Sequence, residues 1–333
     1  MWPWIRYTVF LVIGTAVVAE ILLRVFDPIG IEYAFEIHRY FKTHEPDERF
    51  AYINRPKLEG RFQGVAVSIN RDGFRWPELS AASPENTDRK RIMILGDSIV
   101  FGWGARFEDT FPSRLQAMLD RENMRAEVMP VGVCSWNTRT QYEFLNAKGL
   151  EYKPDLLVLV IAPNDTEIKR EGRTGIPRRD SGEGSKKKNV LQNLVEDVWR
   201  DARRNSYLFA SLQWLSEVSH DKGAKTGVAP DHPGWKDAEM ALGEIIAFAR
   251  KHGIELVIYL FQSDLTETPQ PPFDLYDQYL TAQDITTLSL PDPVFSDRTH
   301  QNSMVDLHPN ALGHDLIAQR MLNDLKSRLD PNR

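Results

Sequence analysis

The segment RIMILGDSIVFG, residues 91–102, decides the fold class, because a run of aliphatic residues leads directly into a turn of Gly96, Asp97 and Ser98. A strand that is apolar on both faces is typical of a parallel sheet covered by helices. Similar strands are predicted at 126–133, 155–165 and 254–261, and helices at 110–123, 141–148, 235–252 and after Pro309. This alternation predicts a three-layer α/β/α domain with a mostly parallel sheet.

The first 26 residues differ from the rest of the chain because they are almost entirely apolar. Trp2 to Leu23 span 22 residues, enough for a helix to cross a hydrocarbon core of about 30 Å. Arg6 and Glu20 then lie near the two interfaces, where a charge costs least. We therefore expect a single transmembrane anchor, with a signal peptide cleaved before Glu20 or a buried soluble helix as the alternatives. The positive-inside rule weakly favours an inside N-terminus, which places the body of the chain outside the cytoplasm, and cleavage would give a secreted protein.

The composition excludes several classes of protein. The 333 residues are 42% hydrophobic and 26% charged, which excludes wholesale disorder, collagen-like repetition and a polytopic membrane protein. A net charge of -6 provides no basic excess for a nucleic-acid backbone, so nucleic acid is not an expected partner. The one cysteine, Cys134, excludes an internal disulfide, a zinc site of several thiolates and an iron–sulfur cluster.

The chain is expected to have three parts. Residues 1–26 form the anchor or signal segment, residues 27–90 a small module with short strands, and residues 91–330 the main domain. The main domain contains an insertion at 166–189, in which 12 of 24 residues are charged and four are glycine. So polar a segment cannot form a core, and we expect either a solvated flexible loop or a lid over the substrate.

Polar residues follow the predicted strands at the points where the strands end. Ser98 follows the first strand, residues 132–137 the second and Asn164 the third, while Asp306 and His308 precede the last helix. Ligands of open parallel sheets bind at the carboxyl ends of the strands. A hydroxyl, amide donors, an imidazole and a carboxylate together suit acyl transfer. Taken singly, each residue also fits a helix cap, a turn or the start of a helix.

Four ordered blocks of sequence resemble the SGNH or GDSL hydrolase family. They are GDSIVFG at 96–102, VGVCSWNT at 131–138, APND at 162–165 and DLHPNALGH at 306–314. INRDGFRWPE at 69–78 and ARFEDTFPSRL at 105–115 are similar to segments of a membrane-anchored bacterial branch. The resemblance covers about residues 60–325, and it implies a flavodoxin-like SGNH domain that uses neither a cofactor nor a metal.

The resemblance implies a role for each residue of a catalytic triad. Ser98 would be the nucleophile, and His308 would take its proton and return it to the leaving group. Asp306 would hold the imidazole in the required tautomer. The neutral imidazole has a suitable basicity near pH 7, because its ordinary pKa is about 6.5.

The resemblance also implies an oxyanion hole, a set of N–H donors for the negative oxygen of the intermediate. Its donors would be the backbone N–H of Ser98, the side chain of Asn164 and the backbone N–H of Ser135, which occupies a position where the family commonly has glycine. Asp97 is expected to brace the turn before the helix, and Gly132 to serve as a turn residue.

Three features of the chain depart from the family pattern. The family usually has its acid three residues before the histidine, where this chain has Val305, whereas Asp306 is only two before. Asp292 and Asp297 are therefore kept as alternative acids. The other departures are Ser135 and Ala162, each at a position where the family commonly has glycine.

We expect a serine-dependent ester hydrolase that acts through an acyl-enzyme, on an O-acyl group of a glycan or a lipid. An O-acyltransferase is the nearest alternative, because a sugar hydroxyl could replace water in the second half of the reaction. A noncatalytic binding or assembly protein on the same fold is the alternative from another class, and the two replaced glycines motivate it.

Overall fold

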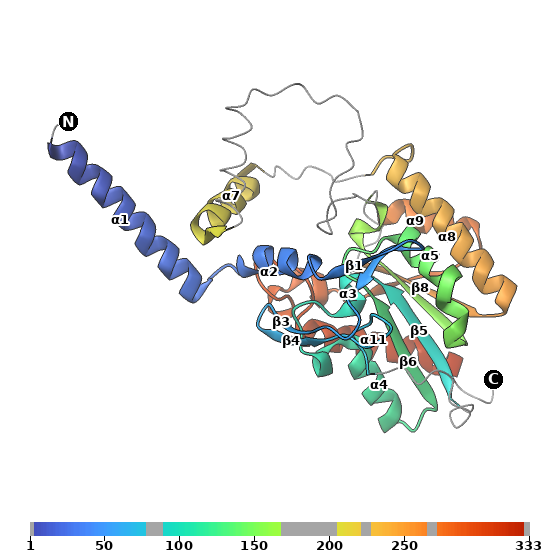
Figure 1. The fold of residues 1–333 in the computed structure, drawn as a ribbon. Coiled ribbons are helices and arrows are strands. Elements are labelled where there is room, and N and C mark those ends of the chain that lie inside the picture. The colour runs from blue at the N-terminus through green and yellow to red at the C-terminus, as the bar shows by residue number, and fades with distance from the viewer. Residues whose placement is uncertain (1–2, 78–88, 168–204, 221–227, 265–271, 330–333) are drawn as a thin grey trace.

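The computed structural model describes residues 3–77, 89–167, 205–220, 228–264 and 272–329, and its centre is a five-stranded sheet (Figure 1). The strands are β5 (Lys90–Gly96), β6 (Ala126–Gly132), β7 (Leu156–Ile161), β8 (Glu255–Ser263) and β9 (Thr287–Leu290). They lie in the order β6-β5-β7-β8-β9, and every neighbouring pair is parallel. The predicted fold class is confirmed.

The order of the strands places a reversal between β5 and β7. The chain passes from β5 to β6 at one edge and then crosses to β7 on the other side of β5. In open α/β sheets, ligands bind outside the carboxyl ends of the strands at such a reversal. The segments after β5 and β7 carry Ser98 and Asn164, so the topology brings these two residues to the same edge of the sheet.

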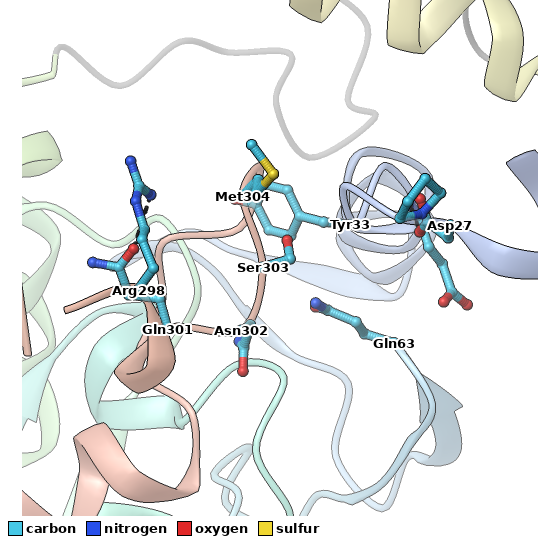
Figure 2. A pocket seen from close by; sticks show the side chains of 11 residues that line it. Asp27, Tyr33, Gln63, Arg298, Gln301, Asn302, Ser303 and Met304 are labelled. Atoms are coloured by element: carbon cyan, nitrogen blue, oxygen red, sulfur yellow. Dashed lines mark hydrogen bonds between the residues drawn. The ribbon is translucent and has the colours of Figure 1, made fainter.

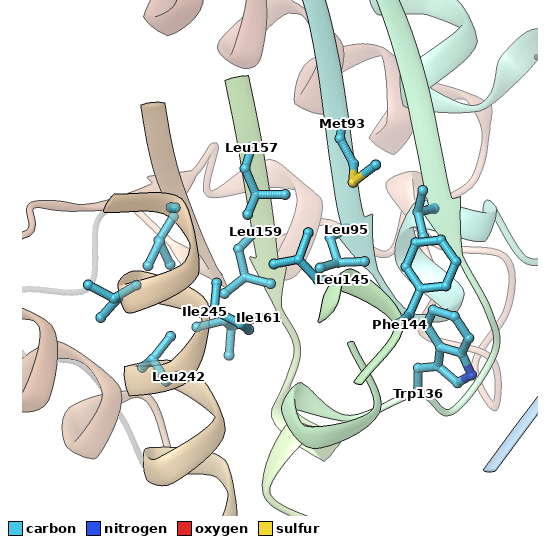
Figure 3. Packing of buried hydrophobic residues seen from close by; sticks show 14 of the residues in the cluster. Met93, Leu95, Trp136, Phe144, Leu145, Leu157, Leu159, Ile161, Leu242 and Ile245 are labelled. Carbon is cyan, nitrogen blue, oxygen red and sulfur yellow. The ribbon is translucent and has the colours of Figure 1, made fainter. Parts of the chain in front are cut away.

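Helices cover both faces of the sheet. They are α4 (Phe111–Arg121) and α11 (Ala311–Leu329) on one face, and α5 (Thr138–Lys148), α8 (Pro233–His252) and α9 (Phe273–Ala282) on the other. Successive side chains of a strand point to opposite faces. Met93 and Leu95 of β5 accordingly pack toward α5 and α8 (Figure 3), whereas Ile92 and Ile94 pack toward α4 and α11. This double burial explains the apolar runs in the sequence.

The helices predicted at 110–123, 141–148 and 235–252 correspond to α4, α5 and α8, with small shifts of their ends. Strand β9 and helix α9 were not predicted, because β9 has four residues, of which two are polar, and pairs along one edge only. The spacing of apolar residues at 190–215 also predicts helix. The structure describes this stretch only from residue 205, where α7 comprises Tyr207–His220. The insertion at 166–189 lies outside the described residues from 168 onward.

The segment between the first helix and β5 forms a helix and two antiparallel hairpins. These elements are α2 (Glu32–Phe41), β1 (His44–Asp47), β2 (Ala51–Asn54), β3 (Glu59–Phe62) and β4 (Val65–Ser68). Tyr40 is fully buried, and its ring lies 4.9 Å from that of Phe62 and 5.2 Å from those of Phe101 and Trp103. Phe101 and Trp103 directly follow the Ser98 turn. The aromatic cluster therefore packs the N-terminal elements against the chain that carries Ser98.

Arg75 links the same two parts of the chain by hydrogen bonds. Its buried guanidinium donates to the carbonyls of Gly102 at 2.8 Å, Ala105 at 2.9 Å and Ala66 at 3.1 Å. Burial lowers the pKa of Arg75 to about 10, so the side chain is still charged at neutral pH. Arg75 belongs to the INRDGFRWPE block, and its contacts give that block a structural role in holding the loop after Ser98.

The first helix, α1 (Pro3–Phe26), extends away from the domain (Figure 1). An 18-residue stretch within residues 4–26 has a mean hydropathy of 2.3, and none of that stretch is buried. Near its end, Glu20 accepts hydrogen bonds from the Ser206 hydroxyl at 2.8 Å and from the backbone N–H groups of Tyr207 and Leu208 at 3.1 and 2.8 Å. Its length and composition suit either a membrane anchor or a signal sequence.

Candidate active site

Ser98 is the first residue of α3 (Ser98–Phe101), in the tight turn after β5. Asp97 caps this helix, because its Oδ1 accepts the backbone N–H of Ile99 at 2.9 Å, as expected from the sequence. Gly96 permits the turn, since a Cβ there would lie 2.4 Å from a methyl of Val100. Ser98 is thus held rigidly at the carboxyl edge of the sheet.

The structure brings Ser98, His308 and Asp306 together from opposite ends of the domain. The Ser98 hydroxyl lies 2.8 Å from Nε2 of His308, and Nδ1 of His308 lies 2.5 Å from Oδ1 of Asp306. Oδ1 also accepts the backbone N–H of His308 at 3.1 Å. The spacing of two residues is sufficient here because the loop folds back and directs both N–H groups of His308 toward one carboxylate oxygen.

The two alternative acids make contacts elsewhere. Asp292 accepts hydrogen bonds from the hydroxyls of Ser263 and Ser296, both at 2.5 Å. Asp297 accepts the backbone N–H of Thr299 at 2.9 Å. In this geometry Asp306 is the carboxylate that contacts the histidine facing Ser98.

Two amide side chains hold the second oxygen of Asp306. Gln63 donates to Oδ2 at 2.7 Å and Asn302 at 3.0 Å, so the fully buried carboxylate is hydrogen-bonded at both oxygens. Gln63 lies in the turn between β3 and β4, and its backbone N–H donates to Glu36 of α2 at 2.9 Å. Neither Gln63 nor Asn302 was predicted from the sequence. No local pattern marks a glutamine in a hairpin turn as a partner of an acid 243 residues away.

The electrostatic surroundings raise the pKa of His308 above its ordinary value of 6.5. Burial by itself lowers this pKa, but the hydrogen bond and negative charge of Asp306, together with the charge of Asp97, outweigh it. Burial in turn raises the pKa of Asp97. His308 can therefore accept a proton readily, because its cation lies between two carboxyl groups.

The turn after β7 positions Asn164 beside Ser98. Asp165 braces this turn, accepting the backbone N–H of Ala162 at 2.5 Å and the Gln141 side chain at 3.0 Å. Burial and the neighbouring Asp97 raise the pKa of Asp165 well above its usual range. The side chain of Asn164 acts against the rise in the pKa of Asp97, which places the turns after β5 and β7 next to each other.

Near the end of β6, Ser135 has an unusual backbone conformation, and Gly132 lies where there is no space for a side chain. Ser135 has a φ of +64°, a left-handed conformation that favours glycine. This fits its alignment with a family glycine. Gly132 is the last residue of β6, and a Cβ there would lie 2.4 Å from the backbone nitrogen of Phe101. Gly132 therefore allows β6 to approach the backbone of α3 closely.

Ser98, Asp97, Asn164 and His308 line a cleft of about 270 Å³. The other lining residues are mostly apolar: Tyr33, Ile99, Ala162, Pro163, Phe261, Val305 and Leu307. Within the described part of the chain, no group of three or more His, Cys, Asp and Glu side chains is placed to hold a metal ion. The cleft thus combines a polar reaction centre with apolar walls that suit the acyl part of an ester.

The fold and the site define a protein of the serine-hydrolase class. A serine, a histidine and an aspartate are hydrogen-bonded in that order at the carboxyl edge of a parallel sheet. A family model of the GDSL-like Lipase/Acylhydrolase family matches residues 94–316. The chain belongs to this family and is an SGNH-type serine esterase, whose activity is the hydrolysis of esters. A comparison with curated proteins found no match at the threshold used.

Solved structures with similar folds include several esterases. The psychrotrophic esterase EstA from Pseudoalteromonas sp. is 14% identical, with a TM-score of 0.44, and the alignment covers 72% of this chain and 98% of EstA. A lipase/acylhydrolase from Enterococcus faecalis is 14% identical, with a TM-score of 0.42 and coverage of 73% and 99%. A two-domain esterase active on acetylated mannans is 13% identical, with a TM-score of 0.43 and coverage of 72% and 50%.

The pH dependence of catalysis should report the pKa of His308. Neutral His308 is the form that can accept the serine proton, so kcat/KM should rise with pH through an apparent pKa above 6.5. Asp306→Asn should move this limb to lower pH, because it removes the charge that raises the pKa, and should lower kcat on the order of 10² to 10⁴. Stopped-flow or steady-state assays from pH 5 to 9 measure both effects. Asp292→Asn and Asp297→Asn are the controls, and loss of activity in either would refute the assignment of Asp306.

Gln63→Leu should reduce kcat by about tenfold, because Asp306 loses one of the two donors that orient its second oxygen. The KM for a small ester such as 4-nitrophenyl acetate should change little, since the variant alters the acid and not the cleft. Gln319→Leu, at an exposed position on α11, is the matched control. An unchanged kcat in a folded Gln63→Leu protein would show that Asn302 alone is sufficient to position Asp306.

Proposed function

We propose that this esterase acts through a covalent acyl-enzyme, with Ser98 as nucleophile, His308 as general base and acid, and Asp306 as the group that orients the imidazole. One observation carries the proposal: the Ser98 hydroxyl lies 2.8 Å from Nε2 of His308 while Nδ1 faces Asp306. That arrangement suits transfer of the serine proton to the imidazole, since the distance lies within hydrogen-bond reach.

The reaction divides into two balanced halves. In the first, Nε2 of His308 takes the Ser98 proton as Oγ attacks the ester carbonyl, and the same proton then passes to the leaving alcohol oxygen as its bond to the acyl carbon breaks. In the second, water gives a proton to Nε2 and adds to the acyl carbon, and Ser98 leaves with that proton. Asp306 stabilises the imidazolium that forms in each half.

We assign the oxyanion donors to the backbone N–H of Ser98, the side chain of Asn164 and the backbone N–H of Ser135. The position of Asn164 in the same cleft as Ser98 supports its role. The left-handed backbone of Ser135 supports the comparison with a glycine that donates its N–H, because an amide donor needs a particular backbone conformation and no particular side chain. The loss of one such donor typically raises the activation barrier by about 3 kcal/mol.

The substrate that we propose is an O-acyl group on a glycan or a lipid. An O-acyltransferase is the second candidate, because the same three residues would transfer the acyl group to a sugar hydroxyl in place of water. The cleft with its apolar walls suits an acyl group in either reaction. A noncatalytic binding protein is the least supported alternative, since a serine aligned with a base and an acid is not needed for binding alone.

Ser98→Ala should abolish ester hydrolysis, with a loss on the order of 10³ to 10⁶ in kcat, because it removes the nucleophile. A fluorophosphonate probe should label the wild type at Ser98 and leave the variant unlabelled, as peptide mass spectrometry can establish. Ser113→Ala, at a serine on α4, is the control for a general effect of removing a hydroxyl. Residual activity within tenfold of wild type in Ser98→Ala would refute the assignment.

We further propose that α1 is an uncleaved single-pass anchor with the catalytic domain outside the cytoplasm, the secreted form being the alternative. The length and hydropathy of the helix support membrane insertion.

Full-length protein should stay in the membrane fraction after washing with carbonate and with high salt, because hydrophobic attachment is insensitive to both. Deleting residues 1–26 should release a soluble and active protein, since the apolar stretch of the helix is not buried in the domain. Deleting residues 1–76 should not, because the aromatic cluster around Tyr40 and the Gln63 contact to Asp306 would be lost. Edman sequencing that begins at Glu20 would contradict retention.

A further inference from the structure

A second cavity, of about 500 Å³, lies between the segment that follows α1 and the loop that leads to His308 (Figure 2). Its lining residues are Asp27, Pro28, Gly30, Glu32, Tyr33, Gln63, Arg298, Gln301, Asn302, Ser303 and Met304. The two walls touch directly, because the carbonyl of Ile29 accepts the backbone N–H of Val305 at 3.2 Å. The cavity is therefore formed by two segments that are about 270 residues apart in the sequence but packed together.

Tyr33 lines both this cavity and the catalytic cleft. Its ring lies 5.8 Å from the ring of His308, so the two cavities share a side chain that lies beside the imidazole of the triad. This position matters for the fate of the leaving alcohol. In the acyl-enzyme reaction the imidazole gives its proton to the leaving alcohol oxygen, so the alcohol part of the ester must lie on the histidine side of the cleft.

The lining chemistry suits an alcohol with many hydroxyl groups. Gln63, Gln301, Asn302 and Ser303 contribute amides and a hydroxyl to the lining, and Tyr33 adds an aromatic ring, whereas the catalytic cleft has mostly apolar walls. The N–H groups of the three amides already donate to Asp306 or to backbone carbonyls. Oε1 of Gln63 has no hydrogen-bond partner among the described residues and is an acceptor left over for a donor. Neutral hydroxyl groups can act as both donors and acceptors with such side chains.

The charges in the cavity favour a neutral ligand over an anionic one. Among the lining residues there are two acidic side chains, Asp27 and Glu32, and one basic side chain, Arg298. Asp27 already accepts the backbone N–H groups of Ile31 and Glu32 at 2.7 and 2.8 Å, and burial raises the pKa of Glu32. Arg298 donates to Gln301 at 2.9 Å and has further N–H groups for a hydroxyl oxygen.

We propose that the second cavity is the subsite for the alcohol part of the ester, that this alcohol is a neutral oligosaccharide, and that the acyl group enters the catalytic cleft. The inference rests on the acyl-enzyme function proposed above. Tyr33 marks the boundary between the two parts of the substrate, next to the oxygen that receives the proton from His308. Specificity for the sugar thus comes from the N-terminal elements and from the loop at 298–304, both of which lie outside the family's four sequence blocks.

Full-length protein in detergent tests the proposal with two esters that share an acetyl group, 4-nitrophenyl acetate and O-acetylated xylotetraose. Met304→Trp places a large ring at the cavity, since Met304 is 55% exposed on its rim. It should lower kcat/KM for the oligosaccharide ester, relative to that for 4-nitrophenyl acetate, by about tenfold or more, the scale of one or two lost hydrogen bonds. Met240→Trp, at an exposed methionine on α8, is the matched control and should leave the ratio unchanged.

A binding measurement separates the subsite from catalysis. In isothermal titration calorimetry with wild type, unacetylated xylotetraose should bind more tightly than tetragalacturonate, and Met304→Trp should weaken its binding. The subsite would be overturned if Met304→Trp lowered kcat/KM equally for both esters or left the ratio of the two values unchanged. It would also be overturned if the anionic oligomer bound more tightly than xylotetraose. Either result would leave the acyl-enzyme function intact. Failure of the wild type to hydrolyse 4-nitrophenyl acetate or to react with fluorophosphonate would instead overturn the proposed function, and the subsite with it.

Discussion

The burial of Asp306 is the constraint on which the arrangement of the active site depends. A carboxylate that water cannot reach must have its oxygens hydrogen-bonded, because burial without partners costs several kcal/mol. Asp306 meets this requirement with the ring and backbone of His308, Asn302 of its own loop and Gln63 of the β3–β4 turn. The donors come from opposite ends of the chain. The catalytic geometry is therefore tied to the packing of the N-terminal elements as well as to the sheet.

This dependence gives the N-terminal elements a role beyond connecting α1 to the domain. The aromatic cluster around Tyr40 and the hydrogen bonds of Arg75 hold them against the loop after Ser98. The same elements contribute Tyr33 and Gln63 to the walls of two adjoining cavities. The alcohol subsite proposed above would then belong to the segment added to a common hydrolase core. The short connection from α1 also places that subsite close to the end of the apolar helix.

The elements that were predicted are those whose local pattern has one explanation. The apolar runs of β5 and β7 indicate strands buried on both faces, as the structure shows. Edge strand β9 escaped prediction because its burial is partial and its pairing one-sided. The roles of Ser135 and Asn164 as oxyanion donors stay predictions, and residues 168–189 of the charged insertion lie outside the described residues.

The sequence by itself determined the fold class, the strand ends that carry Ser98 and Asn164, the segment before the last helix that carries His308, and the apolar character of the first helix. These follow from periodicity and from short motifs. Only the tertiary structure decided which carboxylate faces His308, what holds that carboxylate and where the second cavity lies. These depend on contacts such as Gln63 to Asp306, between residues 243 positions apart. Hydrogen bonds between distant segments leave no periodic signal in a single sequence, since the chain must fold before either partner has a neighbour.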